Sequence, residues 1–438
     1  MRHQRLQSIF ILFCIAASFN LLKLVRRCIG DGLQKSEAIS YLLLKNNTTK
    51  LENTSQDILQ DTVGFEVNSS FQINAITGSD GGVVVKDSGR SEQQLCSREE
   101  VKDGIWIPVT LEKPPYITKT THLRCYPLDD YKKGVWNTYE WKPHADCKLT
   151  SWSRSLFCSL LERATILIIG DSLSWEHYSS LGQMLGLRVH QTSQHDSRIY
   201  QQNHVQFACN NKVRLLFRRD DKLRNITDAL RNTFPQVIVM NRGAHYVNDT
   251  SLISDLKNNF DEIKEWQMTC KQLGMKCHFL WRTTVPGHPL CNMRNYTYPV
   301  NNLQQMESLI ADPLNYNNHT INYHWQDYQH QNELVLKMLS DHYGTNSGSY
   351  SSSSNSSYSN STSSIEYDIM DAYYLNVLRP DEHRAHQKDC LHNCYPGKMD
   401  VYNRLLLHYV RMRRSRYDTQ RQIDRYNEAM KRIGLTSD

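Results

Sequence analysis

The chain has 438 residues and a formal net charge of +6, with 39% hydrophobic and 22% charged residues. A region of roughly 300 residues can bury a full hydrophobic core as one domain. The positive charge is spread along the chain and partly concentrated after Arg411, so it marks no nucleic-acid site. The sequence also contains no Gly-rich phosphate loop.

An apolar segment lies close to the N-terminus. Residues 9–22 are almost entirely apolar, and basic residues flank both ends. The length suits the hydrophobic region of a signal peptide, and including Leu24 and Val25 brings it close to a short membrane span. We therefore interpret residues 1–28 as a cytoplasmic tip with a membrane anchor, or as a signal peptide.

Residues 29–95 are polar, rich in Ser, Asn, Asp and Gly, and show little periodicity. This composition predicts a stem or linker. Glycosylation sequons of the form Asn-x-Ser/Thr are dense along the chain, which is typical of a protein of the secretory pathway. They begin at Asn46, Asn47, Asn53, Asn68, Asn225, Asn248, Asn295, Asn318, Asn355 and Asn360.

The sequence has 12 cysteines. Cys14 and Cys28 lie in or near the N-terminal segment, and all the others follow residue 95. The ten cysteines after residue 95 are an even number, which predicts up to five disulfides, with Cys390 and Cys394 both in bridges, although the connectivity stays open. A zinc site is the alternative, which the lack of any Cys-x-x-Cys pair disfavours.

Residues 96–163 combine four cysteines with a run of aromatic residues. We expect an irregular, disulfide-stapled lead-in to the core. Aromatic rings in such a region can stack on sugars, but packing is the more common role and is the interpretation we favour.

A strand, a tight turn and a helix follow. Thr165 to Ile169 is a short apolar run that predicts a strand buried on both faces. Gly170-Asp171-Ser172 then forms the turn, and apolar residues at helical spacing continue from it. A serine in this position lies at the carboxyl end of a parallel strand, beside a helix N-terminus whose free N–H groups can bind an oxyanion. The tripeptide alone is a weak motif.

From residue 164 onward, strand and helix patterns alternate, which predicts a three-layer α/β/α sandwich with a mostly parallel sheet. Residues 345–364 read as a low-complexity insertion in a core of residues 164–412, and 413–438 as a charged tail. The further predicted strands are 213–217, 236–240, 278–281 and, as the last one, 365–370. The further predicted helices are 252–273, 325–343 and 400–411.

A serine nucleophile needs a base and a group that orients that base. Asp389 precedes His392 by three residues, so its carboxylate can orient the imidazole. The alternative is an Asp that caps a helix, followed by a surface His. His177 is closer to Ser172 in sequence, but on a helix it would point away, so we prefer His392 as the base.

Three blocks of the sequence resemble the plant trichome-birefringence-like proteins. That family belongs to a wider acyl-esterase group with the Ser-Gly-Asn-His (GDSL) type of hydrolase fold. The group also contains a fungal capsule O-acetylation protein and a sialic acid O-acetyltransferase. The resemblance covers about residues 96–412. Its blocks are Trp141-Lys142-Pro143 with Cys147 and Leu149, then Gly170-Asp171-Ser172-Leu173, and finally Leu378-Arg379, Asp381, His383, Asp389-Cys390-Leu391-His392-Asn393-Cys394, Pro396-Gly397, Asp400 and Asn403.

The resemblance implies a catalytic triad of Ser172, His392 and Asp389, with Gly170 and Asp171 supporting the turn. In this fold an Asn after the third strand donates its amide to the oxyanion hole, which assigns that role to Asn241 beside the Ser172 N–H. The alternative for Asn241 is a loop residue in a turn with Gly243.

The sequence also departs from the family pattern. No glycine lies between Gly186 and Gly243, where relatives outside the plant branch carry an oxyanion glycine. Arg218, at the end of a predicted strand, is a candidate for that place, and a surface arginine is its alternative reading. Plant members carry Arg-Asn-Gln shortly after the serine, whereas this chain has residues 175–177 as Trp-Glu-His, so the resemblance leaves donor and acceptor specificity open.

The resemblance therefore implies a single-pass Golgi glycan O-acetyltransferase with a lumenal catalytic domain, or a secreted form of it. We expect a polysaccharide or glycan acceptor and no bound metal or cofactor. The acyl donor would be acetyl-CoA or another acetylated carrier, such as a membrane acetyl-donor protein. Two alternatives are a carbohydrate esterase that uses the same residues and a non-catalytic glycan-binding protein.

Overall fold

The structure is a computed structural model that describes residues 94–109, 116, 139–187, 203–291, 293, 296, 298–316, 323–343, 364–384 and 389–432. The predicted anchor or signal (1–28), nearly all of the stem (29–95) and nearly all of the insertion (345–364) lie outside these residues. One compact unit spans Ser91–Asp438. In the described part of the chain, no helix has the length and apolar character needed to span a membrane.

A six-stranded sheet forms the centre of this unit, with the strand order β4-β5-β3-β6-β7-β8. All neighbours pair in parallel except β4, which runs antiparallel to β5 at one edge. A mostly parallel sheet within an α/β fold is thereby confirmed. The strands are β3 (Thr165–Gly170), β4 (His204–Ala208), β5 (Val213–Arg219), β6 (Val237–Met240), β7 (His278–Arg282) and β8 (Tyr367–Met370).

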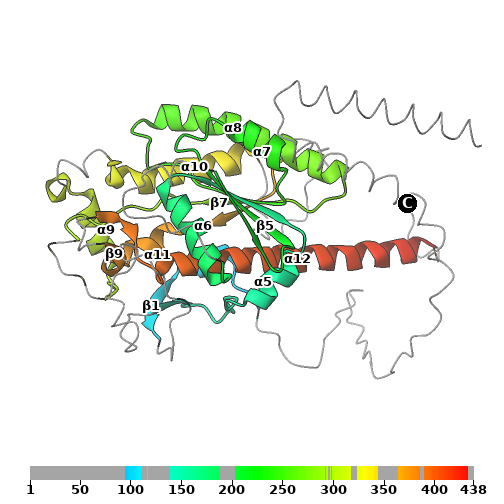
Figure 1. Cartoon of the computed structure of the whole chain (residues 1–438), viewed down its shortest axis with the longest axis horizontal. Coiled ribbons are helices and arrows are strands. Elements are labelled where there is room, and N and C mark those ends of the chain that lie inside the picture. Colours follow the sequence, from blue (N-terminus) through cyan, green and yellow to red (C-terminus); the bar gives the residue numbers. More distant parts are fainter. Residues whose placement is uncertain are drawn as a thin grey trace, which may run out of the picture. The chain divides into compact units, whose positions relative to one another are not determined.

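Helices cover both faces of the sheet (Figure 1). Side chains alternate along a strand, so Leu167 and Ile169 of β3 point to one face and Ile166 and Ile168 to the other. The first pair packs in the cluster that includes α7 (Ile226–Thr233), α8 (Asp249–Gln272) and α10 (Tyr328–Tyr343). The second pair packs with α5 (Arg154–Leu160), α6 (Ser172–Met184) and α12 (Lys398–Arg432).

The lead-in region contributes helix α3 (Arg98–Lys102) and a small antiparallel pair, β1 (Gly104–Pro108) with β2 (Tyr139–Pro143). Trp106 and Trp141 face each other across this pair, with ring centroids 5.5 Å apart, and both are buried. The Trp106 Nε1–H donates to the Leu375 carbonyl at 3.0 Å. These two aromatic side chains therefore pack in the core, as the packing interpretation predicts.

Two strands follow β8, so the prediction that residues 365–370 form the last strand is wrong. After α11 (Tyr373–Val377), strand β9 (His383–Arg384) pairs antiparallel with β10 (Asp389–Asn393) in a separate two-stranded sheet. The strand β10 is rich in polar residues and carries the predicted Asp-x-x-His motif. Helix α9 (Leu303–Ala311) lies between β7 and α10 in the chain. The sequence predicted one continuous helix over 325–343, but a 3-10 turn at Trp325–Asp327 precedes α10.

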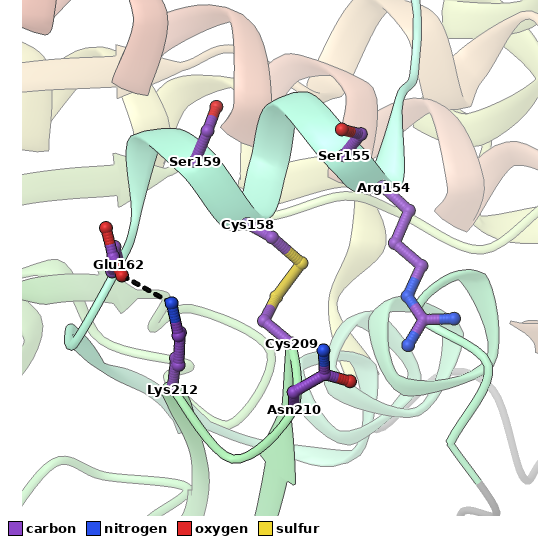
Figure 2. A pocket seen from close by; sticks show the side chains of 8 residues that line it. All are labelled: Arg154, Ser155, Cys158, Ser159, Glu162, Cys209, Asn210 and Lys212. Carbon is purple, nitrogen blue, oxygen red and sulfur yellow. Dashed lines mark hydrogen bonds and ion pairs between the residues drawn. A yellow bond between two sulfur atoms is a disulfide. The ribbon is translucent and has the colours of Figure 1, made fainter.

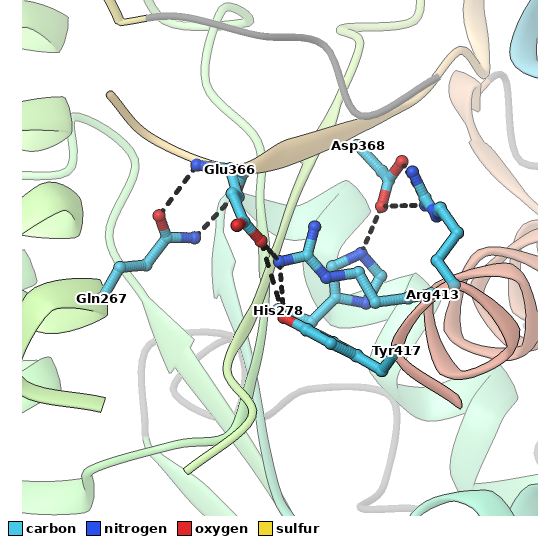
Figure 3. A network of polar contacts seen from close by, with 7 residues as sticks. Gln267, His278, Glu366, Asp368, Arg413 and Tyr417 are labelled. Atoms are coloured by element: carbon cyan, nitrogen blue, oxygen red, sulfur yellow. Dashed lines mark hydrogen bonds and ion pairs between the residues drawn. The ribbon is translucent and has the colours of Figure 1, made fainter. Parts of the chain in front are cut away.

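Helix α12 is much longer than the predicted 400–411, since it continues to Arg432 through the expected charged tail. Figure 3 shows part of the reason. The Arg416 guanidinium donates to Asp368 of β8 at 3.2 Å, and His278 of β7 contacts the same carboxylate at 2.6 Å. Arg413 pairs with Glu366 and donates to the Tyr417 hydroxyl at 2.9 Å. Charged residues of the predicted tail therefore have partners on the sheet, which sequence periodicity does not reveal.

Four disulfides join described cysteines, and Cys394 is also disulfide-bonded, with its partner outside the described residues. The prediction of oxidised cysteines is confirmed for these residues, and it indicates an oxidising compartment of the secretory type. Cys390, beside His392, is bonded to Cys291. The pairs are Cys96–Cys147, Cys158–Cys209, Cys270–Cys277 and Cys291–Cys390.

Candidate active site

The turn between β3 and α6 places Ser172 at the first position of the helix. The Asp171 side chain caps the helix by accepting hydrogen bonds from Leu173 N at 2.9 Å and Ser174 N at 3.3 Å. Gly170 has φ of +150°, and a Cβ there would lie 2.8 Å from the Asn241 carbonyl oxygen and against the Ser174 hydroxyl. A larger residue does not fit at Gly170, so the turn depends on this glycine.

Ser172, His392 and Asp389 come together in the structure. The Ser172 hydroxyl lies 2.8 Å from His392 Nε2, and His392 Nδ1 lies 2.9 Å from Asp389 Oδ2. The carboxylate can only accept, so Nδ1 carries the proton and Nε2 accepts from the serine. Both the imidazole and the carboxylate are partly buried, with 23% and 29% of their side-chain surfaces exposed. This geometry is that of a nucleophile, a base and an orienting acid.

Asp389 uses its two oxygens differently. Oδ1 accepts from Leu391 N at 3.1 Å and from His392 N at 3.0 Å, whereas Oδ2 faces the imidazole. Asp389 begins strand β10 and caps no helix, so the alternative of a helix cap followed by a surface His is wrong; its Oδ1 instead accepts from backbone N–H groups of its own strand. Because a single carboxylate holds the backbone and the ring of His392, the imidazole has little freedom to turn.

Glu176, one helical turn after Ser172, fastens α6 to the strand that carries His392. Its fully buried carboxylate accepts from Asn393 N at 3.1 Å and from Asn393 Nδ2 at 2.8 Å. Its backbone carbonyl accepts from the Tyr395 hydroxyl at 3.0 Å. The sequence showed Glu176 only as a departure from the plant pattern. The sequence did offer one signal for its role, because a glutamate is unusual among the small and apolar residues that begin a buried helix.

A buried arginine lies beneath the nucleophile turn. Arg282, at the end of β7, is 1% exposed, and its Nη2 donates to the Ser174 hydroxyl at 3.1 Å. Burial lowers the pKa of Arg282, while the charges of Asp171 and Glu176 oppose that shift. Arg282 therefore supplies positive charge next to the two acidic side chains that shape the site. Sequence reasoning missed this residue.

The predicted oxyanion groups differ in availability. Within the described residues, the Ser172 N–H makes no hydrogen bond, while the next two N–H groups of the helix are capped by Asp171. The Asn241 amide, in contrast, donates to the Arg282 carbonyl at 2.9 Å and to Thr284 Oγ1 at 3.2 Å. Both Asn241 donors are thus engaged inside the protein, so in this conformation the structure does not offer them to an oxyanion.

In the described part of the chain, neither Arg218 nor His177 contacts Ser172. Arg218 follows Leu216 on β5 by two residues, and Leu216 packs on the α7 and α8 face of the sheet. Alternation along the strand places Arg218 on that face, whereas α6 covers the other. His177 is fully buried next to Tyr402, and burial together with the Arg282 charge lowers its pKa well below the usual value. His177 makes no contact with Ser172, in agreement with the preference for His392.

A pocket of about 770 Å³ lies at α5 and the turn between β4 and β5. Figure 2 shows the side chains that line it. It is lined in part by the Cys158–Cys209 disulfide and by the ion pair of Lys212 with Glu162 at 2.7 Å. Thr165, which begins β3, pairs with Arg214 near this turn, so the pocket lies toward the end of the sheet opposite Ser172. None of the three predicted catalytic residues lines it.

Among the described residues, no three His, Cys, Asp or Glu side chains are grouped so that they could hold a metal ion. Comparison with protein-family models and with curated proteins gave no match for this chain.

Proposed function

We propose that this protein is a glycan O-acetyltransferase of the secretory pathway that acts through an acyl-enzyme on Ser172. The observation that carries the proposal is the line of contacts from Ser172 Oγ through His392 to Asp389, at 2.8 Å and 2.9 Å. The resemblance of the sequence blocks supports assignment to the trichome-birefringence-like group with its Ser-Gly-Asn-His type of fold. The disulfides support an oxidising compartment.

In the first step, His392 Nε2 takes the proton of the Ser172 hydroxyl as the oxygen attacks the acetyl carbonyl of the donor. The Ser172 N–H, at the N-terminus of α6, stabilises the oxyanion, and Asp389 stabilises the imidazolium. The tetrahedral species then collapses, His392 returns the proton to the leaving group, and Ser172 carries the acetyl ester. In the second step His392 takes the proton of a sugar hydroxyl as the sugar oxygen attacks the acetyl ester. His392 then returns that proton to the departing Ser172 oxygen, which restores the serine and the neutral imidazole.

A carbohydrate esterase is the second candidate function, and the exposure of the site supports it. The His392 and Asp389 side chains retain 23% and 29% exposure, so water can approach the base. Transfer to water uses the same residues and the same acyl-enzyme, and the outcome depends on how well the bound acceptor excludes water. A non-catalytic glycan-binding protein would have no need for the aligned serine, imidazole and carboxylate.

Membrane anchoring through residues 1–28 and residence in the Golgi belong to the same proposal, with secretion as the alternative. They are supported by the apolar segment at 9–22 and the density of sequons. Acetyl-CoA or another acetylated carrier would serve as the donor.

The test is a product analysis with purified full-length protein. Acetyl-CoA is supplied with and without a mixture of neutral and acidic oligosaccharides, and mass spectrometry scores acetylated sugar against free acetate. Acetylated sugar that depends on Ser172 supports the transferase. Free acetate alone, in both conditions, shows transfer of the acetyl group to water, and binding of oligosaccharide without either product would favour the glycan-binding protein.

A further inference from the structure

A pair of buried histidines lies directly behind the strand that carries His392. His288, in the loop after β7, is 0% exposed, and His383, in β9, is 3% exposed. Their rings face each other, with His288 Nδ1 2.5 Å from His383 Nε2. The pair connects two main-chain carbonyls, because the outer nitrogen of each ring faces a carbonyl oxygen. The mechanism above uses neither residue.

The two carbonyls determine where the ring protons are. His288 Nε2 lies 2.9 Å from the Val377 carbonyl oxygen, and His383 Nδ1 lies 3.1 Å from the His392 carbonyl oxygen. A carbonyl oxygen only accepts, so each of these nitrogens must carry a proton. If both rings were neutral, the two inner nitrogens would each present a lone pair to the other across 2.5 Å. One additional proton between them removes this conflict.

We propose that His288 and His383 are positioning residues, which share one proton and hold the His392 backbone in place through its carbonyl oxygen. The inference rests on the proposed function, because its consequence is for the reactivity of Ser172. The His383 N–H fixes His392 from behind, while Asp389 holds the N–H and the ring of the same residue. His392 is thus restrained at its backbone carbonyl, at its backbone N–H and at its ring.

The charges around the pair determine how firmly it keeps the shared proton. Burial and the charge of Lys398 on α12 lower the pKa of both histidines, and Arg379 acts on His288 in the same direction. Asp389 opposes this on His383, and Arg379 is itself paired with Asp381 and Glu382. The proton is therefore lost at lower pH than from an isolated imidazolium, and its loss breaks one of the two carbonyl contacts.

Two substitutions separate the positioning contact from the shared proton. In His383→Asn, the side-chain amide can still donate to the His392 carbonyl, but no second ring nitrogen faces His288. In His383→Leu, the side chain has no donor for that carbonyl. We expect His383→Asn to keep kcat within about threefold of the wild type, and His383→Leu to lower kcat by about tenfold or more with KM unchanged, because a displaced base costs rate rather than binding.

The experiment uses full-length protein with ¹⁵N-labelled histidine. Over the acidic part of the pH range in which the protein is folded, we expect one far-downfield imidazole proton that couples to nitrogens of both rings and is absent from His383→Asn. The rate at which a fluorophosphonate labels Ser172 provides an activity readout that needs no acyl donor or acceptor. The labelling rate should be highest in the wild type, lower in His383→Asn and lowest in His383→Leu.

The outcomes separate this inference from the proposed function. Two neutral rings in the wild type at every pH would overturn the shared proton, and a folded His383→Leu with wild-type labelling would overturn the positioning role. If His383→Leu does not fold, a His383→Asn variant labelled tenfold more slowly than the wild type overturns the inference. Normal labelling and a shared proton without any acetyl transfer would contradict the acetyltransferase and leave the positioning role supported.

Discussion

His392 Nε2 lies 2.8 Å from the Ser172 hydroxyl, although the two residues are 220 positions apart in the chain. They reach each other because β3 and α6 present the serine at the carboxyl edge of the sheet, while β10 brings the imidazole to the same place. Glu176 joins the two elements directly, through its hydrogen bonds to Asn393. Contacts of both α6 and β10 therefore hold the Ser172 hydroxyl and the His392 ring in alignment.

The substitution Asp389→Asn tests the orienting role of the carboxylate. The asparagine oxygen can still cap Leu391 N and His392 N, but its amide would donate to His392 Nδ1 and stabilise the wrong tautomer. We expect acyl transfer to fall by about a thousandfold or more while the fold persists. Steady-state kinetics and circular dichroism measure the two effects. Asp228→Asn, at an exposed site on α7, is the control and should be neutral. Equal rates for the two variants would rule out the orienting role.

Glu176→Gln tests the connection between α6 and β10. Asn393 N lies 3.2 Å from Glu176 Oε1 and 3.1 Å from Oε2, so in glutamine one of these oxygens becomes an amide N–H that faces the Asn393 N–H. We expect the free energy of unfolding to drop by about 1–3 kcal/mol. Displacement of the base should lower kcat by about tenfold with little change in KM. Glu162→Gln, which removes an exposed partner of Lys212, is the matched control. A variant with normal kcat would show that the Asn393 contacts are not needed for alignment.

Removing the Cys291–Cys390 disulfide by substitution of both residues with alanine should destabilise the domain. The bridge spans 99 residues, and loss of such a link typically costs about 2–5 kcal/mol. The Cys270–Cys277 bridge spans only 7 residues, so its removal should cost about 2 kcal/mol less in the chain-entropy account. Urea unfolding of the two double variants measures the difference. A larger loss from the short bridge would contradict this account.

Asp400 should make stability depend on pH. Its partly buried carboxyl accepts from the Tyr116 and Ser180 hydroxyls, each at 2.5 Å, and desolvation raises its pKa from 3.8 to about 6. The folded protein therefore binds an extra proton in this window, so this contribution to stability falls as pH rises from 3.8 to about 6 and is then constant.

Asp400→Asn removes the titrating carboxyl, so the free energy of unfolding should depend less on pH in the variant than in the wild type. Relative to the wild type, the variant should gain about 2 kcal/mol in free energy of unfolding between about pH 4 and about pH 7. Urea titrations at the two pH values measure it, with Asp228→Asn as the control. Parallel profiles for Asp400→Asn and the wild type would show that Asp400 is already ionised at the lower pH.

The buried strands could be predicted from the sequence because each is a continuous apolar run between polar turns, as in residues 165–169. The edge strand β4 could not, since Val205 and Phe207 are 50% and 54% exposed and alternate with polar residues. The strand β10 was unpredictable for a related reason. Its polar side chains are held by Glu176, by β9 and by a disulfide, and none of these contacts leaves a local pattern.

The candidate site was predictable where a motif carried the information. Ser172, Asp389 and His392 follow from blocks that resemble a family, and the structure brings the three side chains together. The position of Asn241 at the sheet edge could be predicted as well, but its engagement with Arg282 and Thr284 depends on residues more than forty positions away. The same holds for Glu176, whose partner is on a distant strand.

The most direct test of the central claim is to locate the acetyl group on the enzyme. Full-length protein is mixed with p-nitrophenyl acetate, an activated ester that needs no natural donor site, then quenched and mapped by peptide mass spectrometry. We expect acetyl on Ser172 in the wild type, none at this peptide in Ser172→Ala, and formation slower by about a thousandfold or more in His392→Ala. The Ser172→Ala/His392→Ala double variant should turn over acetyl ester little more slowly than either single variant, because such residues act as a unit. Wild-type turnover by a folded Ser172→Ala protein would contradict the assignment of Ser172 as the nucleophile.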